Sequence, residues 1–179
     1  MKKARVFIIT GEQGEGKTTR LQEVIKLLRP SLPDIFGFYA IGEWENGYRN
    51  RFRLVDIRTG NVHLLCYREG QANLSKIPFV FIEDTLRKGM QIISDGMAQN
   101  GRLAVIDEIG RFELKGKVWY QSLKKLLSNG YPVIITVRKN QLEAVIEKFG
   151  LKGARIFFTG LDSAVAIASE ITEQLAGRS

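Results

Sequence analysis

The chain has 179 residues, of which 44% are hydrophobic and 26% are charged, as in soluble globular proteins. This length favours one compact domain with a substantial core, and we expect a single domain over residues 1–179. The only cysteine, Cys66, excludes an internal disulfide and a zinc site built from cysteines. No apolar run approaches the ~18 residues of a membrane helix, so we expect a cytoplasmic protein without a membrane partner.

The formal net charge is +8, and a basic surface attracts nucleic acid, anionic membranes or nucleotides. The lysines and arginines are spread along the whole chain, without a block of five or six like charges. This pattern favours a solvated basic surface over a dedicated nucleic-acid face. Nucleic acid is therefore an alternative partner that we do not favour, and the sequence predicts no particular oligomeric state.

The first half of the chain begins with an apolar run at residues 5–10, "RVFIIT", which predicts a buried strand. Residues 17–30 place apolar side chains at i, i+3, i+4 and i+7 and end in proline, which predicts a helix. Residues 34–43 predict a second strand, and residues 51–69 predict a β-hairpin that turns at "TGN".

The second half alternates helices with strands. We expect Pro78 to open a helix that Gly89 and Gly96 weaken and that Asn100-Gly101 ends. The elements expected after it are a strand within 102–110, a helix at 118–130, a strand at 131–137, a helix at 140–150 capped by Asn140, a strand at 154–160 and a helix at 163–177 capped by Asp162. Such alternation implies an α/β fold with a mostly parallel sheet, helices on both faces and the hairpin as an insertion.

The segment "GEQGEGKT" at residues 11–18 lies between the first expected strand and the first expected helix. Gly11, Gly16, Lys17 and Thr18 match the phosphate-binding loop pattern G-x-x-x-x-G-K-[ST] in full. In such a loop, glycines let successive backbone N–H groups point at the phosphates, assisted by the positive end of the next helix. We expect Lys17 to reach the β- and γ-phosphates and the Thr18 hydroxyl to ligate Mg²⁺.

A nucleoside triphosphate, ATP or GTP, would contact this loop mainly through its backbone. Glu12 and Glu15 do not oppose binding, because we expect side chains at the variable loop positions to point to solvent. The candidate nucleotide-binding residues are Gly11, Glu12, Gln13, Gly14, Glu15, Gly16, Lys17, Thr18 and Thr19.

A second motif, "LAVIDEIG" at residues 103–110, places Asp107 at the end of an apolar strand, where it could hold Mg²⁺ together with Thr18. Glu108 follows it and is the expected general base, which takes a proton from the water aimed at the γ-phosphate. Asp107 and Thr18 are the candidate metal ligands, and Glu108 and Lys17 are the candidate catalytic residues. A glutamate beside the magnesium aspartate favours hydrolysis of the triphosphate to diphosphate and phosphate.

Two other function classes remain open. A small nucleotide or nucleoside kinase would hold a second substrate and exclude water, but no acceptor-binding motif is recognisable. A nucleotide-gated RNA-binding module would use hydrolysis only to reset its state. A guanine-specific switch protein is disfavoured, because "RKNQ" at 138–141 does not supply the usual Asn-Lys-x-Asp base reader.

The chain resembles the small stand-alone nucleoside triphosphatase family, also called the cancer-related nucleoside-triphosphatase family, from its first strand to its last helix. The resemblance is carried by "TGEQGEGKTT", "GFYA" at 37–40, "RNRF" at 49–52 and "DEIGRFEL" at 107–114. It implies a three-layer P-loop NTPase fold with an extra strand between the two nucleotide-binding strands. It also implies slow, Mg²⁺-dependent hydrolysis of several nucleoside triphosphates. Arg51 stands where family members often have glycine, and Ala40 where many have threonine.

Several other polar residues have both a functional and a structural interpretation. Arg49, Arg51 and Arg53 alternate in a predicted strand, so we expect them to share one face. That face would bind phosphate, nucleic acid or carboxylates, or would charge a hairpin edge against strand pairing, which we favour. Thr136 either contacts the γ-phosphate or the attacking water, or is only a strand residue. Arg138 is expected to solvate the loop rather than approach the phosphates.

Glu113 is expected to order the turn after "DEIG", and His63 is expected to have a structural role. The aromatic residues that could stack on a base are Trp44, Tyr48, Trp119 and Tyr120. Trp119 lies on an apolar helical stripe with Leu123, so we expect it to pack in the core.

Overall fold

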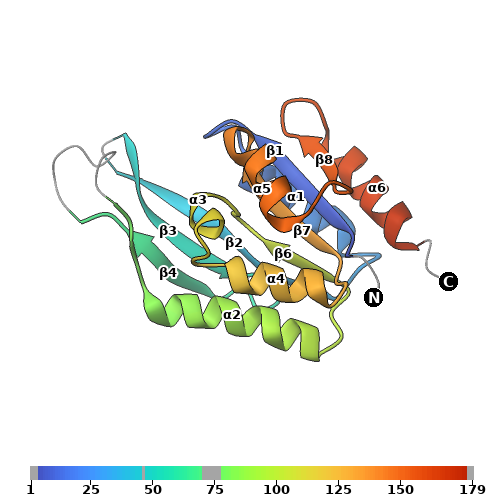
Figure 1. Ribbon diagram of the computed structural model, residues 1–179, viewed down its shortest axis with the longest axis horizontal. Coiled ribbons are helices and arrows are strands. Elements are labelled where there is room, and N and C mark those ends of the chain that lie inside the picture. Colours follow the sequence, from blue (N-terminus) through green and yellow to red (C-terminus); the bar gives the residue numbers. More distant parts are fainter. Residues whose placement is uncertain (1–3, 46, 70–77, 177–179) are drawn as a thin grey trace.

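Eight strands form one sheet in the described part of the chain, which comprises residues 4–45, 47–69 and 78–176 of a computed structural model (Figure 1). Their order across the sheet is β5-β4-β3-β2-β6-β7-β1-β8. The strands are β1 (Val6–Gly11), β2 (Ile35–Glu45), β3 (Tyr48–Asp56), β4 (Val62–Tyr67), β5 (Val80–Phe81), β6 (Leu103–Ile106), β7 (Val133–Arg138) and β8 (Arg155–Phe158).

Five neighbouring strands, β2, β6, β7, β1 and β8, pair in parallel, which confirms the mostly parallel sheet. β7 lies between β1, which leads into the glycine-rich segment, and β6, which leads into Asp107. The extra strand implied by the family resemblance is therefore confirmed. Because parallel strands end at the same edge of the sheet, the segments that follow β1, β6, β7 and β8 meet there.

Beyond β2 the sheet is antiparallel. The hairpin predicted at 51–69 is confirmed, because β3 and β4 pair antiparallel through most of their length. The prediction was incomplete, since β2 runs to Glu45 and itself pairs antiparallel with β3. The short strand β5 adds a fourth antiparallel member on β4, so the insertion extends the sheet far beyond the two expected strands.

Helices cover both faces of the sheet and complete three layers (Figure 1). The helical elements are α1 (Lys17–Leu28), α2 (Glu83–Ala98), α3 (Arg111–Leu114), α4 (Tyr120–Ser128), the 3₁₀ helix η2 (Lys139–Gln141), α5 (Leu142–Phe149) and α6 (Ala164–Ala176). In β1, Phe7 and Ile9 pack in the core that α1 and α6 cover, whereas Val6 and Ile8 pack in the core that α2, α4 and α5 cover. No helix in the described ranges has the length and the apolar character needed to cross a membrane.

Helix α2 begins at Glu83 and not at Pro78, which corrects the predicted start. Phe79 and Ile82 have helical spacing, but residues 80–81 instead form β5 and pair with β4. Aromatic and β-branched residues favour this extended conformation, and the acidic residues at 83 and 84 suit the positive end of a helix. Gly89 and Gly96 have a packing role, because a methyl group there would overlap Trp119 and Phe36.

The two predicted helix caps are also wrong. Asn140 lies within η2, and α5 has Gln141 at its N-cap without a side-chain hydrogen bond. Asp162 accepts a hydrogen bond from the Phe158 N–H at 2.6 Å, so its carboxylate is held by the turn after β8. Ser163 caps α6 instead, since its hydroxyl accepts a hydrogen bond from the Ala166 N–H at 3.2 Å in the first turn of that helix.

Candidate nucleotide site

The segment at 11–18 forms a glycine-rich turn between the end of β1 and the start of α1. Gly14 and Gly16 have φ of 82° and 81°, a left-handed conformation that glycine adopts without the strain that other residues incur. Lys17 opens α1, and its ammonium donates hydrogen bonds to the carbonyls of Gly11 at 3.2 Å and Glu12 at 2.8 Å. The cation is therefore held against the loop, and burial lowers the pKa of Lys17.

Glu12 and Glu15 differ in how their side chains leave the loop. The Glu12 carboxylate lies 3.4 Å from the ammonium of Lys139 at the surface, as expected for a solvent-facing position. The Glu15 carboxylate instead accepts hydrogen bonds from the Glu12 N–H at 2.6 Å and from the Thr159 hydroxyl at 3.2 Å. Glu15 is exposed, as expected, but these two donors also tie its carboxylate to the loop and to the end of β8.

Asp107, immediately after β6, connects the loop to two neighbouring strands. Its carboxylate accepts hydrogen bonds from the Thr18 hydroxyl at 2.9 Å, the Ala40 N–H at 3.0 Å and the Thr136 hydroxyl. Asp107 is only 2% exposed, and burial raises its pKa while these hydrogen bonds oppose the rise. The two expected metal ligands, Thr18 and Asp107, are thus in contact, and the Thr136 hydroxyl is directed at the same carboxylate.

Glu108 forms an ion pair with Arg138, whose Nε lies 2.9 Å from the carboxylate. The same guanidinium donates a hydrogen bond to the Gln13 side chain of the loop at 3.3 Å. Burial raises the pKa of Glu108, whereas the positive charge of Arg138 opposes that rise. Arg138 contacts the loop, as expected, and its ion pair with Glu108 is a further contact that the sequence did not predict. The sequence did offer one clue to this ion pair. Arg138 ends a strand, Glu108 follows another, and both strands were expected in one parallel sheet, whose strand ends lie close together.

Glu113 orders the turn after "DEIG", as expected. One carboxylate oxygen accepts a hydrogen bond from the Gly110 N–H at 2.8 Å, and the other accepts one from the Trp119 N–H at 3.1 Å. Glu113 is 2% exposed, and burial raises its pKa to about 7 despite these hydrogen bonds. A buried carboxyl group therefore holds together the two ends of the segment that carries α3.

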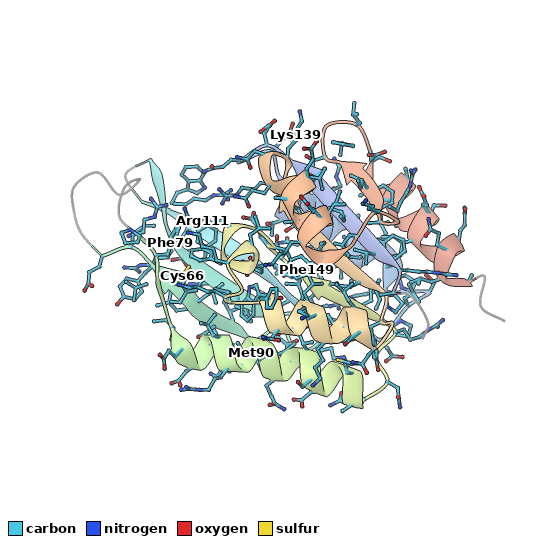
Figure 2. The ribbon with its side chains drawn as sticks, viewed as in Figure 1. Cys66, Phe79, Met90, Arg111, Lys139 and Phe149 are labelled. Atoms are coloured by element: carbon cyan, nitrogen blue, oxygen red, sulfur yellow. The ribbon has the colours of Figure 1, made fainter. Side chains whose placement is uncertain are left out.

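Part of a cavity of about 740 Å³ is lined by polar groups of this region, namely Gln13, Thr18, Asp107, Glu108, Glu113 and Arg138. The remainder is lined mainly by aromatic and arginine side chains, and Figure 2 shows Cys66, Phe79 and Arg111 reaching this region from β4, the segment before β5 and α3. We call this part the aromatic chamber and define it by Arg49, Phe52, Arg68, Phe79, Arg111 and Phe112.

Arg49, Arg51 and Arg53 do not share one face, contrary to the expectation. A β-bulge at Asn50, in the pairing of β2 with β3, interrupts the alternation of side chains between Arg49 and Arg51. Arg49 consequently lies with Phe52 on the wall of the cavity. Arg53 pairs with the carboxylate of Glu43 and Arg51 is exposed, so the favoured interpretation as a charged hairpin surface applies only to those two residues.

The other aromatic and imidazole side chains have varied surroundings. Trp119 is 2% exposed and packs on Phe38 with ring centroids 4.5 Å apart, which confirms its place in the core. Trp44 is 65% exposed, with the guanidinium of Arg49 over its ring at 5.2 Å. The His63 ring lies 3.3 Å from the Lys88 ammonium and does not line the cavity. The side chain of Tyr48 lies outside the described residues.

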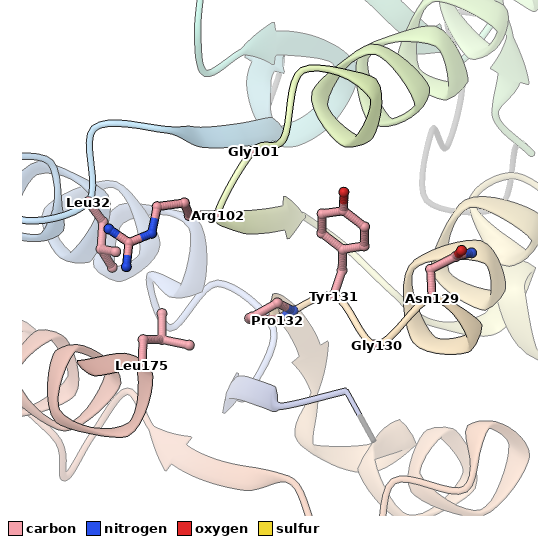
Figure 3. Close-up of a pocket in the computed structure, with 8 residues that line it drawn as sticks. All are labelled: Leu32, Gly101, Arg102, Asn129, Gly130, Tyr131, Pro132 and Leu175. Atoms are coloured by element: carbon pink, nitrogen blue, oxygen red, sulfur yellow. The ribbon is translucent and has the colours of Figure 1, made fainter. Parts of the chain in front are cut away.

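A second cavity, of about 420 Å³, lies at the opposite edge of the sheet, beside the segments that precede β6 and β7. Figure 3 shows Leu32 and Leu175 on one side of it and Tyr131 on the other, with Pro132 between them. No carboxylate lines this cavity among the described residues.

Known proteins share this sequence pattern. A family model described as NTPase matches residues 6–171. The nucleoside-triphosphatase THEP1 of Saccharolobus solfataricus is 31% identical over 167 residues, which cover 93% of this chain and 90% of that protein. The nucleoside-triphosphatase THEP1 of Archaeoglobus fulgidus is 27% identical over 173 residues, which cover 94% and 98%.

Two solved structures share the fold. A human cancer-related nucleoside triphosphatase superposes with a TM-score of 0.71 at 23% identity, covering 98% of this chain and all of that one. THEP1 from the hyperthermophile Aquifex aeolicus superposes with a TM-score of 0.70 at 22% identity, covering 95% and 98%. The P-loop NTPase fold expected from the resemblance is confirmed. With the family model matching nearly the whole chain and a relative above 30% identity, this chain belongs to the NTPase family.

Proposed function

We propose that the protein hydrolyses nucleoside 5'-triphosphates to diphosphates and phosphate with the help of Mg²⁺, and that one domain performs the whole reaction. The observation that carries this proposal is the 2.9 Å hydrogen bond between the Thr18 hydroxyl and the Asp107 carboxylate. It joins the loop that would hold the phosphates to the strand end that would supply the acid. The relatives named nucleoside-triphosphatase support the same reaction.

Mg²⁺ fits the donors at this junction. Thr18 and Asp107 present oxygen atoms, and a cation would compensate the charge of the buried Asp107 carboxylate. The described ranges contain no cluster of three or more His, Cys, Asp or Glu residues that could hold a metal, so most ligands would be water and phosphate oxygens, which Mg²⁺ prefers. Thr18 and Asp107 would hold the ion, which when bound neutralises charge on the transferring phosphoryl group.

The loop and Lys17 would bind the phosphates. The backbone N–H groups of residues 11–18 lie at the N-terminus of α1, where the helix dipole favours an anion. Lys17 would exchange its hydrogen bonds to the Gly11 and Glu12 carbonyls for bonds to β- and γ-phosphate oxygens. Burial lowers the pKa of Lys17 and so disfavours its charged form. Bound phosphates are negative, so they would oppose this effect and favour the charged ammonium.

Glu108 would take the proton of the attacking water. Burial raises the pKa of its carboxyl group, and a carboxylate with a raised pKa is a stronger base than an exposed one. Arg138 holds this carboxylate at 2.9 Å and also reaches Gln13, so it would keep Glu108 directed toward the loop. We assign Arg138 the role of a positioning residue.

Broad base tolerance is part of the proposal. The chain lacks the Asn-Lys-x-Asp pattern of a guanine reader, and the contacts proposed above for the triphosphate all involve its phosphates. Phosphate release from ATP, GTP, CTP and UTP, with Mg²⁺ or with EDTA, tests it. We expect Mg²⁺-dependent release from several of these triphosphates.

Asp107→Asn should abolish the Mg²⁺ dependence together with most of the activity, whereas Asp34→Asn, at an exposed acid before β2, should behave like the parent. Release that EDTA leaves unchanged would exclude Thr18 and Asp107 as ligands of an essential ion. Triphosphate binding without any release would overturn hydrolysis as the function.

A further inference from the structure

The aromatic chamber combines rings and cations in a way that hydrolysis does not use. Arg68 lies over Phe79 with its guanidinium 4.2 Å from the ring centroid, and Arg111 lies over Phe112 at 4.9 Å. Phe52 packs edge-on against Phe79 with centroids 5.4 Å apart. Flat aromatic and guanidinium surfaces of this kind stack on a planar heteroaromatic ring, and arginine also binds phosphate with paired hydrogen bonds.

One donor of the chamber lacks a partner. The Nε atom of Arg49 is buried and has no hydrogen-bond partner among the described residues, although the guanidinium lies over the Trp44 and Phe52 rings. Buried donors are almost always satisfied by protein groups, water or ligands, so this one on a cavity wall is available to an acceptor that a ligand supplies. A phosphate or a base carbonyl oxygen would meet that requirement.

With the triphosphate placed as proposed, the chamber would lie on the γ-phosphate side of the loop. Lys17 and Glu108 would flank the γ-phosphate, so the α-phosphate and the nucleoside extend away from Glu108. In the sheet, β1 and β8 lie on that side, whereas the chamber is built on β3 and on Arg68 just after β4, beyond β6 and β2. With the triphosphate placed as proposed, its nucleoside would therefore lie outside the chamber. The whole cavity of about 740 Å³ lies within the ~300–1,000 Å³ range of small-molecule sites.

We propose that the aromatic chamber binds a nucleoside monophosphate, which accepts the γ-phosphoryl group of the triphosphate held by the loop. The base stacks on one ring of the Phe52–Phe79 pair, whose planes are 73° apart, and the phosphate faces Arg111 and the γ-phosphate. This assignment rests on the proposed function for the placement of the triphosphate and adds a second acceptor beside water.

The transfer balances without a base. An oxygen of the dianionic acceptor phosphate attacks the γ-phosphorus and forms a new P–O bond, while the bond from that phosphorus to the β–γ bridging oxygen breaks. The electron pair leaves with the nucleoside diphosphate, and the acceptor becomes a second diphosphate. No proton moves, because the attacking oxygen carries none. Hydrolysis by the proposed route needs Glu108, whereas this transfer does not.

The experiment follows γ-labelled ATP with Mg²⁺ and each of AMP, GMP, CMP and UMP, and separates labelled diphosphate from free phosphate. We expect at least one monophosphate to become labelled in a saturable manner. Glu108→Gln should suppress free phosphate and retain the labelled diphosphate. Arg49→Ala should lower the ratio of labelled diphosphate to free phosphate by roughly tenfold, because a charge-assisted contact is lost. Arg51→Ala, on the same strand but outside the cavity, should match the parent.

Each failure has a distinct meaning. Free phosphate without any labelled diphosphate would overturn the acceptor site and leave hydrolysis standing. Equal ratios in Arg49→Ala and the parent would place the acceptor elsewhere and overturn the assignment of the chamber. Arg49-dependent binding of short single-stranded RNA, with no monophosphate labelled, would give the chamber to nucleic acid instead. Absence of both products would overturn the proposed function together with the transfer.

Discussion

A cavity lies at each end of the parallel strands, which we call the carboxyl edge and the amino edge of the sheet. Buried charged groups gather at the carboxyl edge. At the carboxyl ends of the parallel strands, Lys17, Asp107 and Glu113 are buried, and burial shifts the pKa of each. At the amino ends, the smaller cavity is lined by turns and by apolar groups such as Leu32 and Leu175. Burial of ionisable groups destabilises the folded state unless they are paired, so their concentration at one edge marks the functional edge more clearly than cavity volume does.

The largest expected effect tests the chemistry at the carboxyl edge. Glu108→Gln keeps the shape of the side chain and removes the proton acceptor, so hydrolysis should fall by ~10²–10⁴-fold while triphosphate binding persists. Phosphate release and a binding titration measure the two quantities separately. Glu12→Gln, at the exposed rim of the loop, is the control and should retain most activity. Unchanged hydrolysis in Glu108→Gln would exclude Glu108 as the base.

A second prediction concerns the buried cation of the same edge. Lys17→Ala removes the charge that the β- and γ-phosphates require, and turnover should fall by ~10²–10³-fold, as for loss of one transition-state donor. Unlike in Glu108→Gln, triphosphate binding should weaken as well. Lys139→Ala, which removes an exposed ion pair with Glu12, is the matched control. Parent-like turnover in Lys17→Ala would show that this loop does not hold the triphosphate.

The third prediction measures the stability cost of buried charge at this edge. Burial raises the pKa of Glu113 from 4.5 to about 7, so between these values the folded state binds more protons than the unfolded state. Its contribution to the free energy of unfolding should therefore fall as pH rises through this window, by about 3 kcal/mol in total. Urea unfolding at pH 5 and pH 8 measures this fall.

Glu113→Gln should lack the fall that this carboxyl group causes, whereas Glu147→Gln, at an exposed position on α5, should retain it. Equal pH dependence in Glu113→Gln and the parent would mean that Glu113 titrates in the folded protein much as it does in the unfolded chain.

The smallest effect is expected at the amino edge. Arg102 is exposed and lines the smaller cavity, so Arg102→Ala should change the free energy of unfolding by only ~0.5 kcal/mol and leave phosphate release near the parent rate. Thermal unfolding and the phosphate assay check both values. A large loss of hydrolysis would contradict the contrast between the two edges.

The sequence predicted best what depends on neighbours in the chain. The strand at 5–10, the helix at 17–30 and the strand at 131–137 correspond to β1, α1 and β7, because hydrophobic periodicity and the glycine-rich motif act locally. Asp107 and Thr18 were paired correctly as neighbours because the two motifs carry a known mutual geometry.

What the sequence did not predict depends on tertiary pairing. Phe79 and Ile82 have helical spacing, yet pairing of β5 with β4 decides the conformation of residues 80–81. The Glu108–Arg138 ion pair joins residues 30 positions apart and has no local pattern. The aromatic chamber draws its walls from β3, the residue after β4, α3 and the segment before β5, so only the folded chain brings these rings and guanidinium groups together.

The Ala40 N–H in β2 donates a hydrogen bond to Asp107, so β2 contacts the polar part of the cavity. Ala40 also lines that cavity, so a small molecule in the aromatic chamber and a triphosphate in the loop would act on the same strand. Any effect of one ligand on the affinity of the protein for the other must then be mutual. Whatever factor the first ligand imposes on the dissociation constant of the second, the second must impose on the dissociation constant of the first.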